Sequence, residues 1–215
     1  SGPFDWIGID MEHGNIDLSQ LSQILLAIEN QRKISLVRTS NNDDNNISRY
    51  LDLGAKGLII PNANTPEIIQ KIVQKTRYKK GIRGVGYSRS NSYGLKLKDQ
   101  MKFSDSIEII PMIENLSAFD NLDKILDIKE INILFIGPKD LENSLKKEKS
   151  KFKLKDVIKI IRKKVISKKK ICGIHQVEPE IKKLDNKIKE GYKFIAYSTD
   201  AQFIVKGFSN VEEKI

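Results

Sequence analysis

The stretch Phe4–Gly14, FDWIGIDMEHG, indicates how this chain folds. Apolar residues dominate its first half and stop abruptly at Asp10, Glu12 and His13, which a glycine follows. A buried parallel strand has this pattern, because both faces of a parallel sheet are covered while the carboxyl ends of its strands open into the crevice where ligands bind. We therefore expect a buried strand that delivers ionisable side chains to a functional site.

Short β-like segments alternate with helical ones along the rest of the chain. The further strands are expected at Ile34–Val37, Gly57–Ile60, Ile107–Ile113, Ile133–Ile136, Lys170–Ile174 and Phe194–Tyr197. Helices are expected at Leu18–Glu29, Ile47–Leu53, Pro66–Thr76, Ser117–Leu126, Lys155–Ser167 and Pro179–Glu190, with a last amphipathic stretch after Ala201. About seven β/α units of this length favour an α/β fold of the (β/α)₈ barrel type over an open doubly wound sheet.

Length and composition fit one domain covering residues 1–215. The chain is 39% hydrophobic with a mean hydropathy of −0.40, which suits a large domain with a single core. No apolar run approaches the roughly 18 to 20 residues of a membrane span, and the N-terminus lacks a secretory pattern. The single cysteine, Cys172, excludes an internal disulfide framework and suits a reducing compartment, so we expect a cytoplasmic protein without a membrane partner.

The formal charge of +10 raises the question of a nucleic-acid partner. The lysines, however, spread over several helical segments and concentrate at residues 146–170, where Phe152 is the one interleaved aromatic. The sequence also carries no zinc, RNA-recognition or helix-turn-helix signature. We interpret the charge as solvated helix faces and expect no nucleic-acid partner.

An ionisable side chain recurs just beyond the apolar run of strand after strand. The residues in this position are Asp10 and His13, Arg38, Glu114, Asp140 and His175. Each of them taken alone could be a loop residue or a helix cap. In a parallel barrel, five strand ends in the same phase place these side chains around one mouth.

Seven stretches carry a resemblance to a known family, in family order and over nearly the whole chain. They are FDWIGIDMEHG, LVRTSNND, RYLDLGAKGLIIP, TRYKKGIRGVG, MIEN, FIGPKDL and EGYKFIAYSTD. Together they resemble the HpcH/HpaI aldolases, the metal-dependent class II pyruvate aldolases that include 2,4-dihydroxyhept-2-enedioate aldolase and 2-keto-3-deoxyglucarate aldolase. The resemblance implies a TIM barrel and a carbon–carbon lyase that reversibly cleaves a 4-hydroxy-2-oxo acid to pyruvate and an aldehyde. Its expected partners are a small-molecule keto acid and an aldehyde.

The resemblance also implies a divalent metal cofactor, Mg²⁺ or Mn²⁺, with Co²⁺ possible. Glu114 and Asp140 match the two protein ligands of the family. Carboxylates suit a hard cation, and such an ion can hold the charge of a pyruvate enolate as a Lewis acid. Asp140 could instead be only a helix cap after Gly-Pro-Lys.

His13 matches the acid/base residue of the family, where it pairs with an aspartate three residues earlier, here Asp10. Arg38 matches the arginine that stabilises the oxyanion beside the metal. The alternative for His13 is a structural histidine that satisfies polar groups of a loop. The alternative for Arg38 is a salt bridge inside the barrel mouth. Glu12 lies between Asp10 and His13 in the sequence and is expected to support them and not to be catalytic itself. Asp52 keeps the family's spacing from the arginine.

The backbone amides around Gly137, Lys139 and Asp140 match the segment that receives the pyruvate carboxylate, because free N–H groups at a helix start suit an anion. His175 stands where some members carry a leucine at the rim of the acceptor pocket. These four residues are therefore the expected substrate-binding set.

The sequence departs from the family at several positions. Met112 replaces a glutamine found two residues before the metal-binding glutamate in many members, and Glu142 replaces a serine. Arg83 and Arg89, in a glycine-rich loop, could hold an acidic or phosphorylated acceptor aldehyde or be solvated.

Family members usually have a further strand and helix before the equivalent of Phe4. We therefore expect a barrel that lacks its first β/α unit and exposes two strand edges, as an N-terminally incomplete form or one completed by a partner. Members commonly form trimers or hexamers with an exchanged C-terminal helix, so a homo-oligomer is expected. The alternatives are another citrate-lyase-like acyl or pyruvate lyase, and a basic barrel protein without chemistry.

Overall fold

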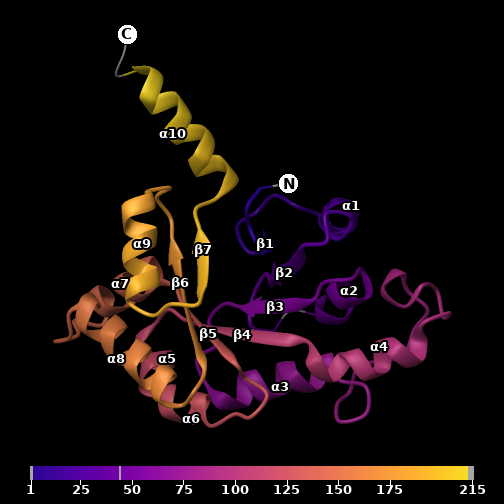
Figure 1. Cartoon of the computed structure of the whole chain (residues 1–215). Coiled ribbons are helices and arrows are strands. Elements are labelled where there is room, and N and C mark those ends of the chain that lie inside the picture. Colours follow the sequence, from indigo (N-terminus) through magenta and orange to yellow (C-terminus); the bar gives the residue numbers. More distant parts are fainter. Residues whose placement is uncertain (1, 44, 213–215) are drawn as a thin grey trace.

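Seven parallel strands form a nearly closed barrel in the computed structural model, which describes residues 2–43 and 45–212 (Figure 1). The strands are β1 (Trp6–Asp10), β2 (Ile34–Arg38), β3 (Gly57–Ile60), β4 (Glu108–Ile113), β5 (Ile133–Ile136), β6 (Ile171–Gln176) and β7 (Phe194–Tyr197). Each pairs with the next in chain order, from β1 to β7. The expected parallel barrel is confirmed, and β6 runs two residues further than predicted, so that His175 lies inside the strand.

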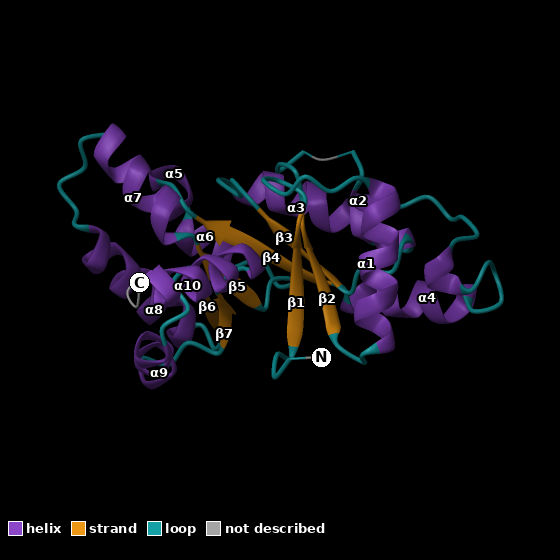
Figure 2. Cartoon of the chain, turned by 90° about the horizontal axis from the view of Figure 1, so that it is seen from above, coloured by secondary structure: helices purple, strands orange, loops and turns teal. Residues whose placement is uncertain are grey.

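The helices lie around the outside of the strands (Figure 2), except the last one, which extends away from the barrel (Figure 1). They are α1 (Leu18–Asn30), α2 (Ile47–Asp52), α3 (Pro66–Thr76), α4 (Leu97–Phe103), α5 (Leu116–Asp120), α6 (Leu122–Leu126), α7 (Pro138–Lys147), α8 (Leu154–Ser167), α9 (Ile181–Lys189) and α10 (Asp200–Glu212), with 3₁₀ turns at Arg89–Asn91 and Ser104–Ser106. The single helix predicted at Ser117–Leu126 is two short helices that meet at Asn121. Within the described chain, no helix is long and apolar enough to cross a membrane.

The helix starts follow from local side chains. The carboxylate of Asp17 accepts the backbone N–H of Gln20 at 2.8 Å, and the Gln20 side chain accepts the N–H of Asp17 at 2.9 Å, which completes a capping box at α1. Thr65 caps α3, with Pro66 in its first turn, where a missing N–H costs nothing.

The alternation of side chains along the strands divides the core into two layers. A large cluster lies between the strands and the helices. A smaller one fills the barrel interior and consists of Leu36, Ile59, Ile110, Met112, Phe135 and Phe194, with Trp6 packed against it. The rings of Trp6 on β1 and Phe194 on β7 stack with centroids 4.4 Å apart and an interplanar angle of 4°. Side chains thus connect the first and last strands.

Candidate active site

The residues that end neighbouring strands meet at one mouth of the barrel. Asp10 and Arg38 are the last residues of β1 and β2 and are paired in register. Glu114 directly follows β4, Asp140 lies in the first turn of α7 after β5, and His175 is near the end of β6. Because all strands are parallel, their carboxyl ends lie at the same edge, which is where barrel enzymes place their chemistry.

The guanidinium of Arg38 rests on two carboxylates. Its Nε donates to Oδ1 of Asp10 at 2.8 Å, and its Nη2 donates to Oδ2 of the same residue. Its Nη1 lies 3.1 Å from Oε2 of Glu12. Burial alone would raise the pKa of Asp10, but the hydrogen bonds and charge of Arg38 outweigh it and lower that pKa. Arg38 is therefore held in one orientation at the mouth.

His13 lies at the edge of this cluster, with 70% of its side chain exposed. Its Nε2 is 3.8 Å from Oε2 of Glu12. Asp10 accepts the backbone N–H of His13 at 3.3 Å, and its carboxylate is engaged by Arg38. The expected pairing of Asp10 with the imidazole of His13 is not what the structure shows. Glu12 takes that place, because it lies between the imidazole and the guanidinium.

Glu114 is the most buried carboxylate of the mouth, with 4% of the residue exposed. Its Oε1 accepts the backbone N–H of Asn62 at 2.6 Å. Burial raises the pKa of Glu114 to about 7, and the nearby charges of Glu12 and Asp140 act in the same direction. The carboxylates of Glu12, Glu114 and Asp140 therefore lie within electrostatic reach of one another.

The first turn of α7 packs directly against Glu114. A Cβ atom at Gly137 would stand 3.0 Å from both Cβ and Oε2 of Glu114 and 3.2 Å from Cε of Met112. No side chain caps the N–H groups of this turn, which begins with Pro138. Uncapped N–H groups at a helix start suit an anion. Binding an anion through these backbone groups does not require the side chain of Lys139, which is exposed.

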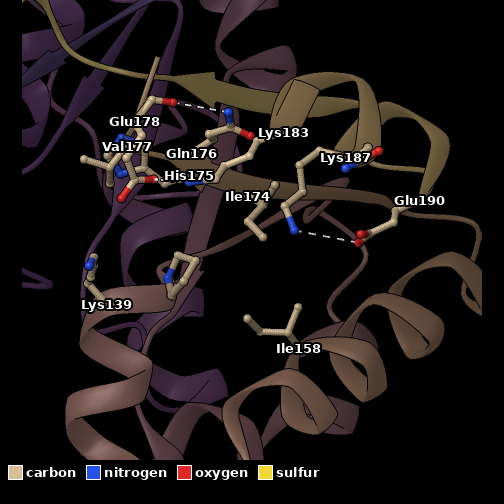
Figure 3. Close-up of a pocket in the computed structure, with 12 residues that line it drawn as sticks. Lys139, Ile158, Ile174, His175, Gln176, Val177, Glu178, Lys183, Lys187 and Glu190 are labelled. Carbon is tan, nitrogen blue, oxygen red and sulfur yellow. Dashed lines mark hydrogen bonds and ion pairs between the residues drawn. The ribbon is translucent and has the colours of Figure 1, made fainter. Parts of the chain in front are cut away.

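His175 faces the same cluster from β6. Burial lowers its pKa, as does the charge of Arg38, while Asp10 acts in the opposite direction. A cavity of about 310 Å³ opens beside His175 and Lys139 and continues between α8 and α9 (Figure 3). Lys183, Lys187 and Glu190 line its far part, which is therefore polar.

The donor set of the mouth fits a hard divalent cation. Glu114 and Asp140 supply two carboxylates. Burial, and after it the charges of Glu12 and Asp140, raise the pKa of Glu114, and a cation beside it would favour its ionised form. Within residues 2–43 and 45–212, no group of three or more His, Cys, Asp or Glu side chains is arranged to hold a metal ion. Water and substrate oxygens would have to complete the shell, as they commonly do for Mg²⁺.

Asp52, Arg83 and Arg89 lie away from this mouth. Asp52 ends α2 and pairs with Arg83 at 2.6 Å. Arg89 donates to the carbonyl of Leu53 at 2.8 Å and to Glu29 at 2.6 Å. The segment of Arg83 and Arg89 connects α3 to β4, and a helix-to-strand connection lies at the amino ends of the strands. Neither a supporting role for Asp52 nor an acceptor-binding role for the arginines fits this chain's own mouth.

The model of the HpcH/HpaI aldolase/citrate lyase family matches residues 2–206. The chain belongs to this family. Among curated relatives, this HpcH/HpaI family member is 35% identical over 145 residues to the hydroxypyruvate/pyruvate aldolase of Deinococcus radiodurans, covering 66% of this chain and 52% of that protein. It is 36% identical over 145 residues to the 2-keto-3-deoxy-L-rhamnonate aldolase of Escherichia coli K12, covering 66% and 54%. The match thus spans about half the length of these relatives.

Solved structures agree on the fold of this HpcH/HpaI family member. A family protein from Burkholderia cenocepacia superposes with a TM-score of 0.89 at 23% identity, covering 99% of this chain and 86% of that one. Macrophomate synthase gives a TM-score of 0.77 at 20% identity, with 98% and 77% covered. Because both identities are below 25%, these superpositions establish the fold of the chain and no more.

The ion pair between Glu12 and Arg38 agrees with the supporting role expected of Glu12. Sequence reasoning missed one contribution to the mouth of this HpcH/HpaI family member. Asn62 binds Glu114 through its backbone and has a left-handed φ of 50°. An available signal was the position of Asn62 two residues beyond the apolar run of β3, close to the strand-end position that identified Arg38 and Glu114.

Proposed function

We propose that this chain forms the active site of a metal-dependent class II aldolase that reversibly cleaves a 4-hydroxy-2-oxo acid into pyruvate and an aldehyde. The supporting observation is the juxtaposition at one mouth of a buried Glu114, Asp140 in the first turn of α7, and the clamped guanidinium of Arg38. The aldolase names of relatives that are 35% and 36% identical to this chain over 145 residues support the same activity.

Glu114 and Asp140 are the proposed metal ligands, and Mg²⁺ or Mn²⁺ is the proposed ion, with Co²⁺ as a substitute. When bound, the ion would supply Lewis-acid stabilisation of the negative charge that develops on the pyruvate half. The two carboxylates would hold such an ion from neighbouring strand ends, and the N–H of Asn62 binds the Glu114 side chain.

The uncapped amides around Gly137, Lys139 and Asp140 are proposed to hold the substrate carboxylate. Arg38 is proposed to donate to the 2-oxo oxygen, where charge accumulates as the C3–C4 bond breaks. Asp10 positions Arg38 and leaves its charge available to the substrate because the guanidinium carries further N–H groups.

His13 is the proposed acid/base residue, with Glu12 as its partner. It takes the proton of the 4-hydroxyl group as the aldehyde forms, and the pyruvate half gains a proton at C3 in exchange. His175 borders the space on the side where the aldehyde leaves. We further infer a cytoplasmic homo-oligomer, in keeping with the family resemblance, and small molecules as its ligands.

The test is release of pyruvate from a panel of 4-hydroxy-2-oxo acids, with and without EDTA. We expect chelator-sensitive turnover that Mg²⁺ or Mn²⁺ restores. Glu114→Gln should lower kcat/KM by about 100-fold or more, because it removes a ligand of the charge-stabilising ion.

Glu108→Gln is the matched control, since Glu108 lies on the same strand at its opposite end, where it binds the side chain of Asn132. Turnover that survives both EDTA and Glu114→Gln would contradict the metal assignment. Cleavage of acyl or citryl substrates, with no pyruvate released from the panel, would favour the alternative of a citrate-lyase-like acyl lyase.

A further inference from the structure

A second cavity, of about 170 Å³, lies at the other end of the barrel. Its walls come from the connection between α2 and β3, from the segment between α3 and β4, and from α4. Both connections run from a helix to the next strand and so lie at the amino ends of the strands. In Figures 1 and 2, α4 and α7 stand on opposite sides of the molecule. This cavity is separate from the candidate active site.

Arg83 is the buried cation of this cavity, with 1% of its side chain exposed. Its Nη2 donates to Oδ1 of Asp52 at 2.6 Å, and its guanidinium carbon lies 4.6 Å from the centroid of the Tyr78 ring. Its Nε is buried and has no hydrogen-bond partner among the described residues. A buried charged donor without a partner is costly, so such a group points to an ion or polar ligand that satisfies it.

Two lysines stand at the rim of the same cavity. Lys56 and Lys96 are exposed and line it from different segments, and Asp99 is the one acidic residue of its lining. The Nζ of Lys56 lies 5.5 Å from the centroid of the Phe103 ring, which places the ammonium over the cavity wall. Even with Asp52, the ion-pair partner of Arg83, counted beside Asp99, basic side chains outnumber acidic ones, and the field inside favours an anion.

A polar network fixes the wall between Arg83 and the rim. The amide nitrogen of Gln100 donates to the hydroxyl of Ser90, and its amide oxygen accepts from Tyr78 at 3.1 Å and from Asn91 at 2.8 Å. Gln100 and Ser90 both line the cavity. Their mutual contacts leave the wall with a set geometry before any ligand binds, which lowers the entropic cost of binding.

We propose that this cavity binds a phosphate group, either as inorganic phosphate or as the phosphate of a small phosphomonoester. One buried guanidinium and two rim ammonium groups line the space, each from a different segment of the chain. A tetrahedral dianion offers oxygens to several cationic groups at once, whereas a carboxylate offers two oxygens in one plane. The cavity volume leaves room for a small organic group beyond the phosphate.

The test measures dissociation constants of inorganic phosphate and of glycerol phosphate for the full chain by calorimetry, in EDTA and at constant ionic strength. We expect saturable binding at one site. The Lys56→Ala/Lys96→Ala double variant should raise the dissociation constant about tenfold or more, since hydrogen bonds to charged groups are strong. Asp99→Asn should lower it, because it removes the acidic member of the lining.

Lys98→Ala is the matched control, since Lys98 lies on α4 outside the cavity lining and should leave binding unchanged. Glu114→Gln should also leave it unchanged, which separates this site from the proposed aldolase site. Tighter binding of glycerol phosphate than of phosphate would identify a phosphomonoester as the ligand, and equal binding would identify phosphate itself. Absent binding, binding unaltered in the double variant, or equal binding of malonate would overturn the proposal.

Discussion

Asp10 and Arg38 are paired twice, once by the register of β1 against β2 and once by a two-pronged ion pair between their side chains. The side-chain contact therefore depends on the strand register, because a slip of one residue would turn Arg38 to the other face of the sheet. The strand register thus places the carboxylate of Asp10 where it orients the guanidinium at the barrel mouth.

Replacing Arg38 by lysine should cost activity while the fold survives. An ammonium cannot contact both oxygens of Asp10 in fork geometry and also reach Glu12, so the charge remains but its position is lost. We expect kcat/KM to fall by about 100-fold, the usual effect of losing one oxyanion donor. Arg49→Lys, at an exposed position of α2, is the control. Equal activity of both variants would remove Arg38 from the mechanism.

Direct titration with Mn²⁺ should report on Glu114 and Asp140 independently of turnover. Removing either carboxylate leaves one protein ligand, so Glu114→Gln and Asp140→Asn should each weaken Mn²⁺ binding by about 10- to 100-fold or more. Glu108→Gln should bind as the wild type does. Unchanged affinity in both site variants would place the ion elsewhere.

Adding one methyl group at Gly137 should disturb the site without unfolding the chain. The new Cβ would stand 3.0 Å from Oε2 of Glu114, closer than almost all natural contacts, so the carboxylate or the start of α7 must move. We expect Gly137→Ala to lower both Mn²⁺ affinity and turnover, with a circular dichroism spectrum like that of the wild type. Gly84→Ala meets nothing within 4 Å and should be neutral.

Cys172 should be unreactive in the native state and should weaken the fold at high pH. The residue is 1% exposed, and burial raises its pKa from 9.0 to about 12. Between these values the native chain keeps a proton that the unfolded chain loses, so the free energy of unfolding should fall as pH rises. A thiol reagent should label one cysteine only in denaturant. Cys172→Ala should show a shallower decline of stability above pH 9, and equal slopes would contradict the burial effect.

The stacked rings of Trp6 and Phe194 should contribute to the stability of the barrel. A double-mutant cycle with Trp6→Leu and Phe194→Leu isolates their coupling, because leucine keeps an apolar side chain in each position. Aromatic pairs typically add about 0.5 to 1.5 kcal/mol beyond area burial, and we expect a coupling in this range from urea unfolding. Additive effects of the two substitutions would show that the rings touch without stabilising each other.

The local pattern of the chain was sufficient to predict the strands and most of the mouth. Apolar runs that stop at Asp10, Arg38 and Glu114 define both where a strand ends and which side chain it presents. Local signals were weaker for α4, which has no clear apolar stripe, and for Asn121, where one predicted helix becomes two. Short helices depend on their tertiary contacts more than on propensity.

The sequence by itself determined the alternation of strands and helices, and with it the gathering of ionisable side chains at one end of a parallel barrel. Tertiary structure decided which ionisable side chains pair. At the mouth, Arg38 binds Asp10 and His13 lies nearest to Glu12, and at the opposite end of the barrel the buried Arg83 binds Asp52. The physical reason is that periodicity and strand order depend on neighbours along the chain, whereas ion pairs depend on distances across strands and on how far each charge is removed from water.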